Sequence, residues 1–259
     1  MESYPRVMVG TDGSDDATAA VKVGGRIAAK LGVPLDLIAV WEDDNNDAWA
    51  VEVTTAAEAI LKDLGVKEVN TKRVSGDPAD QLVAYTNDNP QSLVVVGSTG
   101  LTKASSRLVG STSNRLSHHS IADVLYAREP VPSQWNFVAL ATDGSDTSLK
   151  AVQRGLGLAS ALGATPRLVT AAKSHDDGAR VLAATRAALN LDSAGVEIEE
   201  EILVDSQAAS AIILQGWKYE IVVIGNKSMS GAARLLGSIA NKITHGLETN
   251  LLLVNTTRS

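Results

Sequence analysis

The stretch VMVGTDGSD at residues 7–15 is repeated as VALATDGSD at residues 138–146, which gives Asp12 a counterpart in Asp143, 131 positions further along the chain. Solenoid proteins repeat with periods of ~20–50 residues, whereas a period of this length is that of a whole domain. A chain of 259 residues accommodates two compact domains of ordinary size. We therefore predict two tandem copies of one domain.

Two other landmarks return in the same order and locate the boundary between the copies. The segment VVVG at 94–97 returns as VVIG at 222–225, and Gly-Ser at 110–111 returns at 237–238. The segment PVPSQ at 130–134 holds two prolines between apolar stretches and is typical of a short, stiff linker. These observations predict a first domain at residues 1–130 and a second domain at residues 134–259.

Within each copy, short β-rich runs alternate with stretches of helical periodicity. Such alternation predicts right-handed crossovers and a parallel sheet covered on both faces, so the fold class is α/β with two tandem doubly wound domains. Asp77 before Pro78 suits the start of a helix, and Gly32 and Gly163 suit helix ends. In the first copy we expect strands at 6–10, 35–41, 66–74, 92–97 and 124–127 and helices at 17–31, 50–64, 79–87 and 113–118; in the second we expect strands at 137–141, 167–171, 196–204, 220–224 and 251–254.

Composition excludes several classes of protein. Cysteine is absent, which excludes disulfides, thiolate metal sites and a cysteine nucleophile. The net charge of −7 and the 3% aromatic content argue against a nucleic-acid partner, which would require cationic and stacking side chains. The apolar runs are far shorter than the ~20 residues of a membrane helix, and the N-terminus lacks the features of a signal peptide, so we expect a cytoplasmic protein without a membrane partner.

Ligands of open α/β sheets bind outside the carboxyl ends of the strands, where a stretch rich in glycine, serine and threonine follows the predicted fourth strand. This stretch runs from Gly97 to Ser113 and ends at the start of a predicted helix. Glycines allow close backbone approach, and the free N–H groups of a helix start attract anions. The stretch is neither a Walker loop nor a dinucleotide fingerprint. We interpret it as a phosphate cradle, the alternative being a surface loop with an ordinary serine cap.

The spacing of this stretch gives a specific resemblance. Gly97, Gly100, Gly110 and Ser111 match the pattern of glycine, two residues, glycine, nine residues, glycine and serine or threonine that is the nucleotide-binding signature of the universal stress protein family. The turn at 10–14 and the Gly-Asp-Pro segment at 76–78 also resemble that family. Nearly all of both copies is covered, so the chain resembles a tandem universal stress protein.

The resemblance implies a parallel five-stranded domain of the adenine nucleotide alpha hydrolase-like type, pairing of domains, and binding of ATP with Mg²⁺ or Mn²⁺. It implies that the two copies form a pseudo-twofold intramolecular dimer, with a homodimer of the whole chain as a further possibility. Asp12 could instead cap a turn, and Val40 could be a strand residue only. The cofactor-binding residues implied for the first copy are Thr11, Asp12, Val40, Gly97, Gly100, Gly110, Ser111, Thr112 and Ser113.

The second copy departs from the signature. Its second glycine is replaced by Ser228, its spacer is one residue shorter, and Ala240 stands where the first copy has Ser113. We therefore expect the first site to bind ATP and the second to be weaker, selective for a smaller adenylate, or empty. The residues implied more weakly in the second copy are Thr142, Asp143, Gly225, Ser228, Gly237 and Ser238.

The sequence contains no arrangement typical of a catalytic centre. There is no GxSxG elbow, and the four histidines lack metal-ligand spacing. The acidic run at 42–44 with Asp47 could hold a divalent cation or be a solvated loop. We favour an ATP-binding regulatory module of the stress response, with a slow ATPase or adenine-nucleotide hydrolase and a nucleotide-free scaffold as alternatives; the regulatory protein partner is unknown.

The negative charge is unevenly shared between the copies. Residues 1–133 hold 12 Lys and Arg against 18 Asp and Glu, whereas the remaining residues hold 11 against 12. The copy with the intact signature would therefore repel ATP in the absence of a cation, and we predict binding that depends strongly on Mg²⁺.

Overall fold

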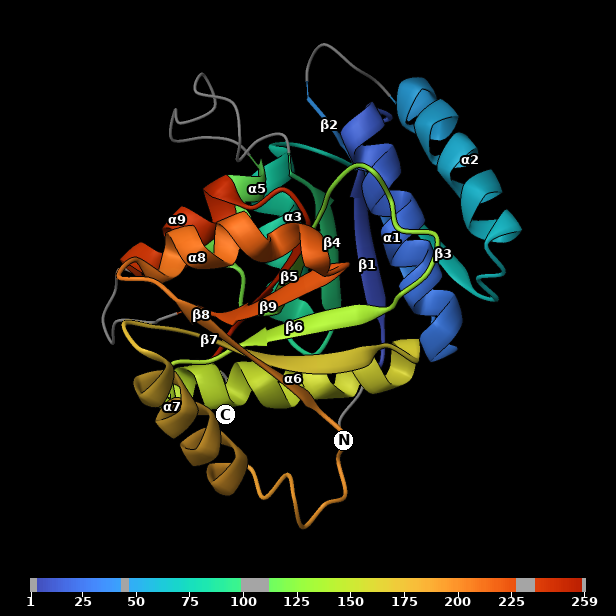
Figure 1. Cartoon of the computed structure of the whole chain (residues 1–259). Coiled ribbons are helices and arrows are strands. Elements are labelled where there is room, and N and C mark those ends of the chain that lie inside the picture. Colours follow the sequence, from blue (N-terminus) through green and yellow to red (C-terminus); the bar gives the residue numbers. More distant parts are fainter. Residues whose placement is uncertain (1–3, 43–46, 99–111, 227–235, 258–259) are drawn as a thin grey trace. The chain divides into compact units, whose positions relative to one another are not determined.

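The computed structural model describes residues 4–42, 47–98, 112–226 and 236–257 (Figure 1). The chain divides into two compact units, Tyr4–Pro132 and Ser133–Ser259, which we call the first and second domains. The first domain contains β1 (Val7–Thr11), α1 (Asp15–Leu31), β2 (Leu35–Trp41), α2 (Asp47–Asp63), β3 (Val69–Ser75), α3 (Pro78–Asp88), β4 (Leu93–Gly97), α5 (Thr112–His119) and β5 (Asp123–Ala127). The second contains β6 (Phe137–Ala141), α6 (Asp146–Leu162), β7 (Thr165–Ala172), α7 (His175–Ala188), β8 (Glu199–Val204), α8 (Ala208–Gln215), a 3-10 turn at Gly216–Lys218, β9 (Ile221–Gly225), α9 (Ser238–Gly246) and β10 (Asn250–Val254).

Each domain is built on five parallel strands. Their order is β3-β2-β1-β4-β5 in the first domain and β8-β7-β6-β9-β10 in the second. In the first, Val7 of β1 is in register with Leu35 of β2 on one side and Leu93 of β4 on the other. The chain thus winds outward from β1 in both directions, which confirms the prediction of doubly wound α/β domains and opens a crevice beyond the carboxyl ends of β1 and β4.

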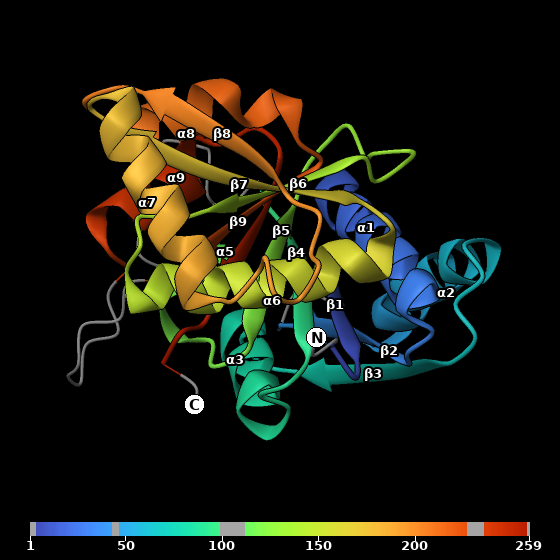
Figure 2. The ribbon, with the colours of Figure 1, turned by 60° about the horizontal axis from the view of Figure 1, so that its bottom comes forward.

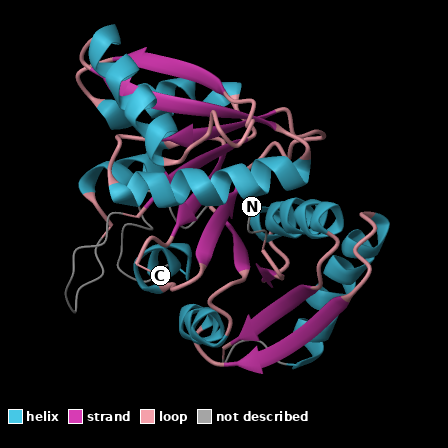
Figure 3. Ribbon diagram, turned by 90° about the horizontal axis from the view of Figure 1, so that it is seen from below, coloured by secondary structure: helices cyan, strands magenta, loops and turns pink. Residues whose placement is uncertain are grey.

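Helices cover both faces of each set of strands, as Figure 3 shows by secondary structure. In the first domain α1 packs with α2 on one face, and α3 packs with α5 on the other. In the second domain α6 and α7 lie together on the near side of β6, β7 and β8 in Figure 2, and α8 and α9 pack together on the far side. Burial on both faces explains why β1, β2 and β4 are almost wholly apolar rather than alternating.

Local sequence determines where the helices begin and end. Ser14 accepts a hydrogen bond from the amide of Ala17 and starts α1 at Asp15, two residues before the expected start. Asp77 caps α3 by accepting from the amide of Asp80, and Gly32 and Gly163 end α1 and α6 in the left-handed region, as predicted. The strands expected at 66–74 and 196–204 begin later than predicted, at Val69 and Glu199.

One buried carboxylate interrupts the apolar run of β2. Asp36, only 2% exposed, accepts hydrogen bonds from Arg6 Nη1 at 2.5 Å, from Asn70 Nδ2 at 3.2 Å and from the hydroxyl of Tyr85. Burial, followed by the hydrogen bond to Asp36, raises the pKa of Tyr85 above its ordinary value. This network lies near the amino end of β2, away from the crevice at the carboxyl ends of the strands.

The second domain has the reverse charge at the equivalent position. Arg167 of β7 stands where β2 has Asp36; its Nε donates to Glu199 Oε2 at 2.9 Å and its Nη1 is 3.5 Å from Glu201 Oε2. Its guanidinium also lies 4.5 Å from the ring centroid of Phe137, the residue that takes the place of Arg6. The two domains therefore stabilise the same region with opposite charges, a buried carboxylate in the first and a half-buried guanidinium in the second.

No helix among the described residues is both long enough and apolar enough to cross a membrane.

Candidate functional site

A cavity of about 730 Å³ opens in the first domain beyond the carboxyl ends of β1, β2 and β4. The side chains and backbone that line it come from the strand ends and from the first turns of α1, α3 and α5. Gly100, Gly110 and Ser111 lie outside the described residues. Six of the residues predicted from the sequence line this one cavity: Thr11, Asp12, Val40, Gly97, Thr112 and Ser113.

The turn from β1 into α1 holds Asp12 at the mouth of the cavity. Gly13 takes a positive φ of 77°, and Asp12 Oδ1 accepts from the amide of Ser14 at 3.0 Å and from its hydroxyl at 2.6 Å. Asp12 therefore does cap a turn, the alternative raised by the sequence. Among the described residues none donates to its second oxygen, Oδ2, and the side chain is exposed. One carboxylate oxygen thus fixes the turn and the other faces solvent.

A side chain at Gly97, at the end of β4, would collide with the first turn of α1. A Cβ atom there would lie 2.0 Å from Asp16 Oδ2 and 2.9 Å from the Asp16 backbone oxygen, well inside contact distance. The first turn of α1 therefore packs directly on the β4 backbone. The same relation recurs in the second domain, where a Cβ on Gly225 would lie 2.8 Å from Thr147 Cγ2. Both glycines allow a helix to pack closely on the strand backbone.

The hydroxyls at the start of α5 have different roles. Ser113 is buried, and its Oγ donates to the backbone oxygen of Gly97 at 2.7 Å. Its only hydroxyl proton is therefore committed to β4, so in this geometry Ser113 has no proton to donate to a phosphate. Thr112 begins the helix and lines the cavity. Of the two predicted hydroxyl donors among the described residues, Thr112 is therefore the one that remains available in the cavity.

Carboxylates that the site prediction did not include also line the cavity. Asp15, Asp16, Glu42 and Asp77 join Asp12 in its wall, and no Lys or Arg is among the described lining residues. Arg115 Nη1 lies 2.9 Å from Asp77 Oδ1 and neutralises that carboxylate. The signal in the sequence was the acidic pair directly after the first-strand turn, in the first helical turn. Among the described residues no three histidine, aspartate or glutamate side chains are arranged to hold a metal ion by themselves, and residues 43–44 of the acidic run lie outside this part of the chain.

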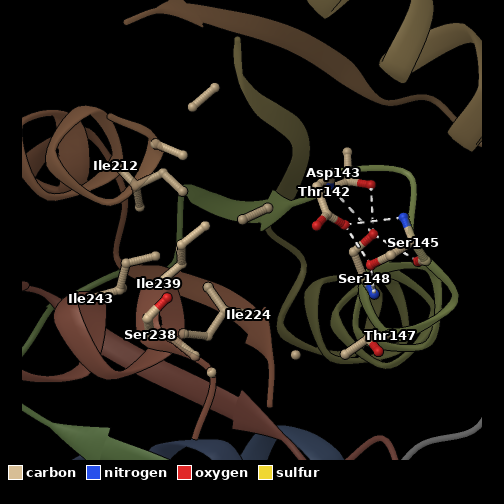
Figure 4. Close-up of a pocket in the computed structure, with 16 residues that line it drawn as sticks. Thr142, Asp143, Ser145, Thr147, Ser148, Ile212, Ile224, Ser238, Ile239 and Ile243 are labelled. Carbon is tan, nitrogen blue, oxygen red and sulfur yellow. Dashed lines mark hydrogen bonds between the residues drawn. The ribbon is translucent and has the colours of Figure 1, made fainter. Parts of the chain in front are cut away.

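The second domain has a smaller cavity, of about 190 Å³, at the equivalent place (Figure 4). Of the residues predicted there, Ser228 lies outside the described part. The turn is preserved, because Asp143 Oδ1 accepts from the amide of Ser145 at 3.0 Å. Burial raises the pKa of Asp143, but the hydrogen bonds from Ser145 outweigh it and hold the pKa below its ordinary value. The predicted residues that line the cavity are Thr142, Asp143, Gly225, Gly237 and Ser238.

Three hydroxyls form a buried cluster beneath this cavity. Thr142 Oγ1 lies 3.1 Å from Ser148 Oγ and 3.0 Å from Thr185 Oγ1. The first domain has Ala17 where the second has Ser148, so this cluster is particular to the second domain. It fixes the polar wall of the cavity, which Figure 4 shows on the side of α6.

Comparison with known proteins gives one family for both domains. The profile of the universal stress protein family matches residues 3–128 and 138–255. The universal stress protein Rv1636 of Mycobacterium tuberculosis is 33% identical over 141 residues, which cover 48% of this chain and 97% of that protein.

Two solved structures are also similar. A universal stress protein from Archaeoglobus fulgidus aligns with 98% of this chain and 100% of its own, with a TM-score of 0.76 and 16% identity, a likeness of fold. A universal stress protein solved in complex with cAMP is 29% identical and aligns with 49% of this chain and 98% of its own, with a TM-score of 0.44.

Proposed function

The chain belongs to the universal stress protein family, and we propose that its first domain binds ATP with a divalent cation as a regulatory module of the stress response. The observation that carries the proposal is the 730 Å³ cavity, in which six predicted residues from four elements and the turn after β1 meet. Its volume falls within the ~300–1,000 Å³ of pockets for ligands of this size.

The wall of the cavity suits the parts of ATP. Val40 offers backbone groups and an apolar surface for the adenine, and Asp12 Oδ2 can accept hydrogen bonds from ribose hydroxyls. Thr112 and the free N–H groups at the start of α5 are available to phosphate oxygens. We propose that Gly100, Gly110 and Ser111, which complete the signature, contribute to the same phosphate site.

The acidic wall supports a requirement for the cation. Asp12, Asp16 and Glu42 would repel a nucleoside triphosphate that carries no cation, and one or two of these carboxylates would complete the ligands of a Mg²⁺ ion held mainly by the phosphates. A bound Mg²⁺ supplies charge neutralisation of the phosphates. The residues of this chain would orient the nucleotide.

Calorimetric titration of the purified full chain tests the proposal. We expect Mg-ATP to bind, the affinity to fall strongly in EDTA, and Asp12→Ala to weaken binding far more than Asp143→Ala. Equal losses from the two substitutions would contradict the assignment to the first domain, and undiminished affinity in EDTA would contradict the role of the cation. Mass spectrometry of the purified protein provides an independent check, since a co-purifying adenylate is expected.

Product formation and the heat of binding separate the alternatives from the regulatory module. An ATPase or nucleotide hydrolase would form product in proportion to protein, and product formation would vanish with Asp12→Ala. A nucleotide-free scaffold would show no heat of binding. The cytoplasmic location and a homodimer of the whole chain stay predictions, and light scattering at several protein concentrations tests the second.

A further inference from the structure

We infer that the cavity of the second domain binds an uncharged adenine nucleoside in preference to a nucleoside triphosphate. The inference rests on the proposed function in one respect, the expectation that this place in each domain receives an adenine compound. It goes further in assigning the second cavity a different class of ligand.

The cavity has two walls of opposite character. Figure 4 shows Thr142, Asp143 and Ser145 on one side and four isoleucines on the other. The polar wall comes from the turn between β6 and α6, and the apolar wall comes from α8, β9 and α9. A ligand that fits both needs a flat apolar ring and, on one side, hydroxyl groups, which is the chemistry of a nucleoside. The isoleucines are Ile212, Ile224, Ile239 and Ile243.

Two of the residues that would hold phosphate in the first domain are replaced here, while Gly237 and Ser238 keep the Gly-Ser pair of the signature. Ile239 of α9 occupies the position of Thr112 of α5, and Ala240 occupies that of Ser113. No Lys or Arg is among the described lining residues, and Asp143 is the only carboxylate among them, so a cation shared with phosphates would have few protein ligands. Among the described lining residues, a triphosphate would meet the side chain of Ile239 and the carboxylate of Asp143 in place of the hydroxyl that Thr112 offers in the first domain.

The size of the cavity leads to the same conclusion. Its volume is about 190 Å³, against about 730 Å³ for the first cavity, so it leaves much less room for a triphosphate chain. Ile239 is 51% exposed, one of the few large apolar side chains in the described residues that remain so accessible. An exposed isoleucine at the mouth of a cavity gains from a ligand that covers it. A base with its sugar would cover Ile239 and place ribose hydroxyls, which donate, against Asp143, which accepts.

Methyl NMR of the full chain, labelled at the isoleucine δ1 carbons, tests the inference. The chain has 12 isoleucines, of which the four named above line the second cavity, while Ile38 lines the first. Single Ile→Val substitutions assign the signals. We expect adenosine to shift the four signals of the second cavity with an affinity at least tenfold higher than that of Mg-ATP at the same signals, and Mg-ATP to shift Ile38.

A pair of matched variants sharpens the test. The double substitution Ile239→Thr with Ala240→Ser restores the first domain's residues, and we expect it to raise the affinity for Mg-ATP relative to adenosine by roughly tenfold at the second cavity. The reciprocal Thr112→Ile should weaken the response of Ile38 to Mg-ATP and leave the adenosine response of the second cavity unchanged. The isoleucine signals remote from both cavities report whether each variant is folded.

The inference is overturned if the four signals do not respond to adenosine up to its solubility, or if Mg-ATP shifts them at the same or lower concentration. These outcomes are distinct from failure of the proposed function, which Ile38 reports alone. Should Ile38 ignore Mg-ATP, the first-domain proposal falls while the four other signals still decide the second. Should the double variant fail to fold, the titration of the unsubstituted chain decides.

Discussion

Gly97→Ala should destabilise the first domain through one side chain, Asp16. The added Cβ would lie 2.0 Å from Asp16 Oδ2 and 2.5 Å from its Cγ, while the nearest backbone atom, the Asp16 oxygen, would be 2.9 Å away. The backbone at Gly97 lies outside the left-handed region, so alanine has no conformational penalty and gains ~0.4–1 kcal/mol from the unfolded chain. Overpacking costs about 1–3 kcal/mol, and contacts this short place the cost at the upper end. We expect a net loss of about 2 kcal/mol.

The role of Asp16 is isolated by a double-mutant cycle. In an Asp16→Ala background the two shortest contacts of the added Cβ disappear and only the backbone oxygen remains close. Gly97→Ala should therefore cost about 1–2 kcal/mol less in that background than alone, an interaction energy well above the ~0.5 kcal/mol of independent sites. The cost of Asp16→Ala by itself is measured in the same cycle and is subtracted in the interaction energy.

Native-state hydrogen exchange of the α1 amides in urea is the appropriate assay, because it reports the stability of the first domain separately from that of the second. Gly225→Ala with Thr147→Ala is the matched cycle in the second domain. Its contact with Cγ2 at 2.8 Å is nearly equalled by the backbone oxygen at 2.9 Å, so removal of the Thr147 side chain should rescue less. Additive free energies for Gly97→Ala and Asp16→Ala, within 0.5 kcal/mol, would refute the reasoning.

Three further predictions concern charge. Asp36→Asn removes the buried carboxylate shared by Arg6 and Tyr85 and should lower the free energy of unfolding in urea by about 2 kcal/mol. This is less than the ~3–5 kcal/mol of a fully buried pair, because the arginine is 35% exposed. The affinity for Mg-ATP should stay within twofold, and a larger change would contradict the separation of network and cavity. Glu201→Gln should lower stability by about 1 kcal/mol at pH 7. Burial raises the pKa of Glu201, but its hydrogen bonds to neighbouring side chains outweigh burial and lower the pKa below its ordinary value of 4.5, so the stabilisation is present above pH 4.5 and disappears in acid. The difference in stability between variant and parent should therefore close as the pH falls below 4.5, and a difference that persisted at pH 3 would be inconsistent with this sign. Glu42→Lys should raise the affinity for ATP in EDTA by roughly tenfold and reduce the dependence of binding on Mg²⁺. Calorimetry with Mg²⁺ and with EDTA measures this, and an unchanged Mg²⁺ dependence would show that Glu42 does not act on the ligand's charge.

The fold was predictable from the sequence because the signals were local and redundant. The repeated turn at Asp12 and Asp143 marked two domains, and apolar runs flanked by helical periods marked buried parallel strands. The capping residue Asp77 placed the start of α3 correctly at Pro78, whereas apolar periodicity placed the start of α1 two residues late, since the first turn of α1 is acidic and carries no apolar pattern. Strand ends were less predictable, because the residues before Val69 and Glu199 have strand-like composition without a neighbour to pair with.

The candidate site was predictable as a set of positions rather than as a set of roles. The strand-end rule located the cavity and six of its residues, but it could not assign the proton of Ser113 to the Gly97 carbonyl, since that bond depends on how α5 approaches β4. Nor could spacing show that Asp16 packs on Gly97, which is a matter of the distance between α1 and the strand. The apolar wall of the second cavity required the fold as well, because Ile212 and Ile239 lie far apart in the sequence.

The reversed charges of Asp36 and Arg167 bear on how a chain that contains two copies of one domain avoids exchanging strands between them. During folding, β2 and β7 are competitors for the same neighbours, and tandem repeats commonly misfold by such swaps. If β7 took the place of β2, Arg167 would lie beside Arg6; if β2 took the place of β7, Asp36 would lie beside Glu199 and Glu201. Each mispairing would place like charges together and leave Asp36 or Arg167 without its partners, whereas apolar residues at these positions would have tolerated it. A network that contributes modestly to the stability of each domain therefore also distinguishes correct from incorrect partners while the chain folds.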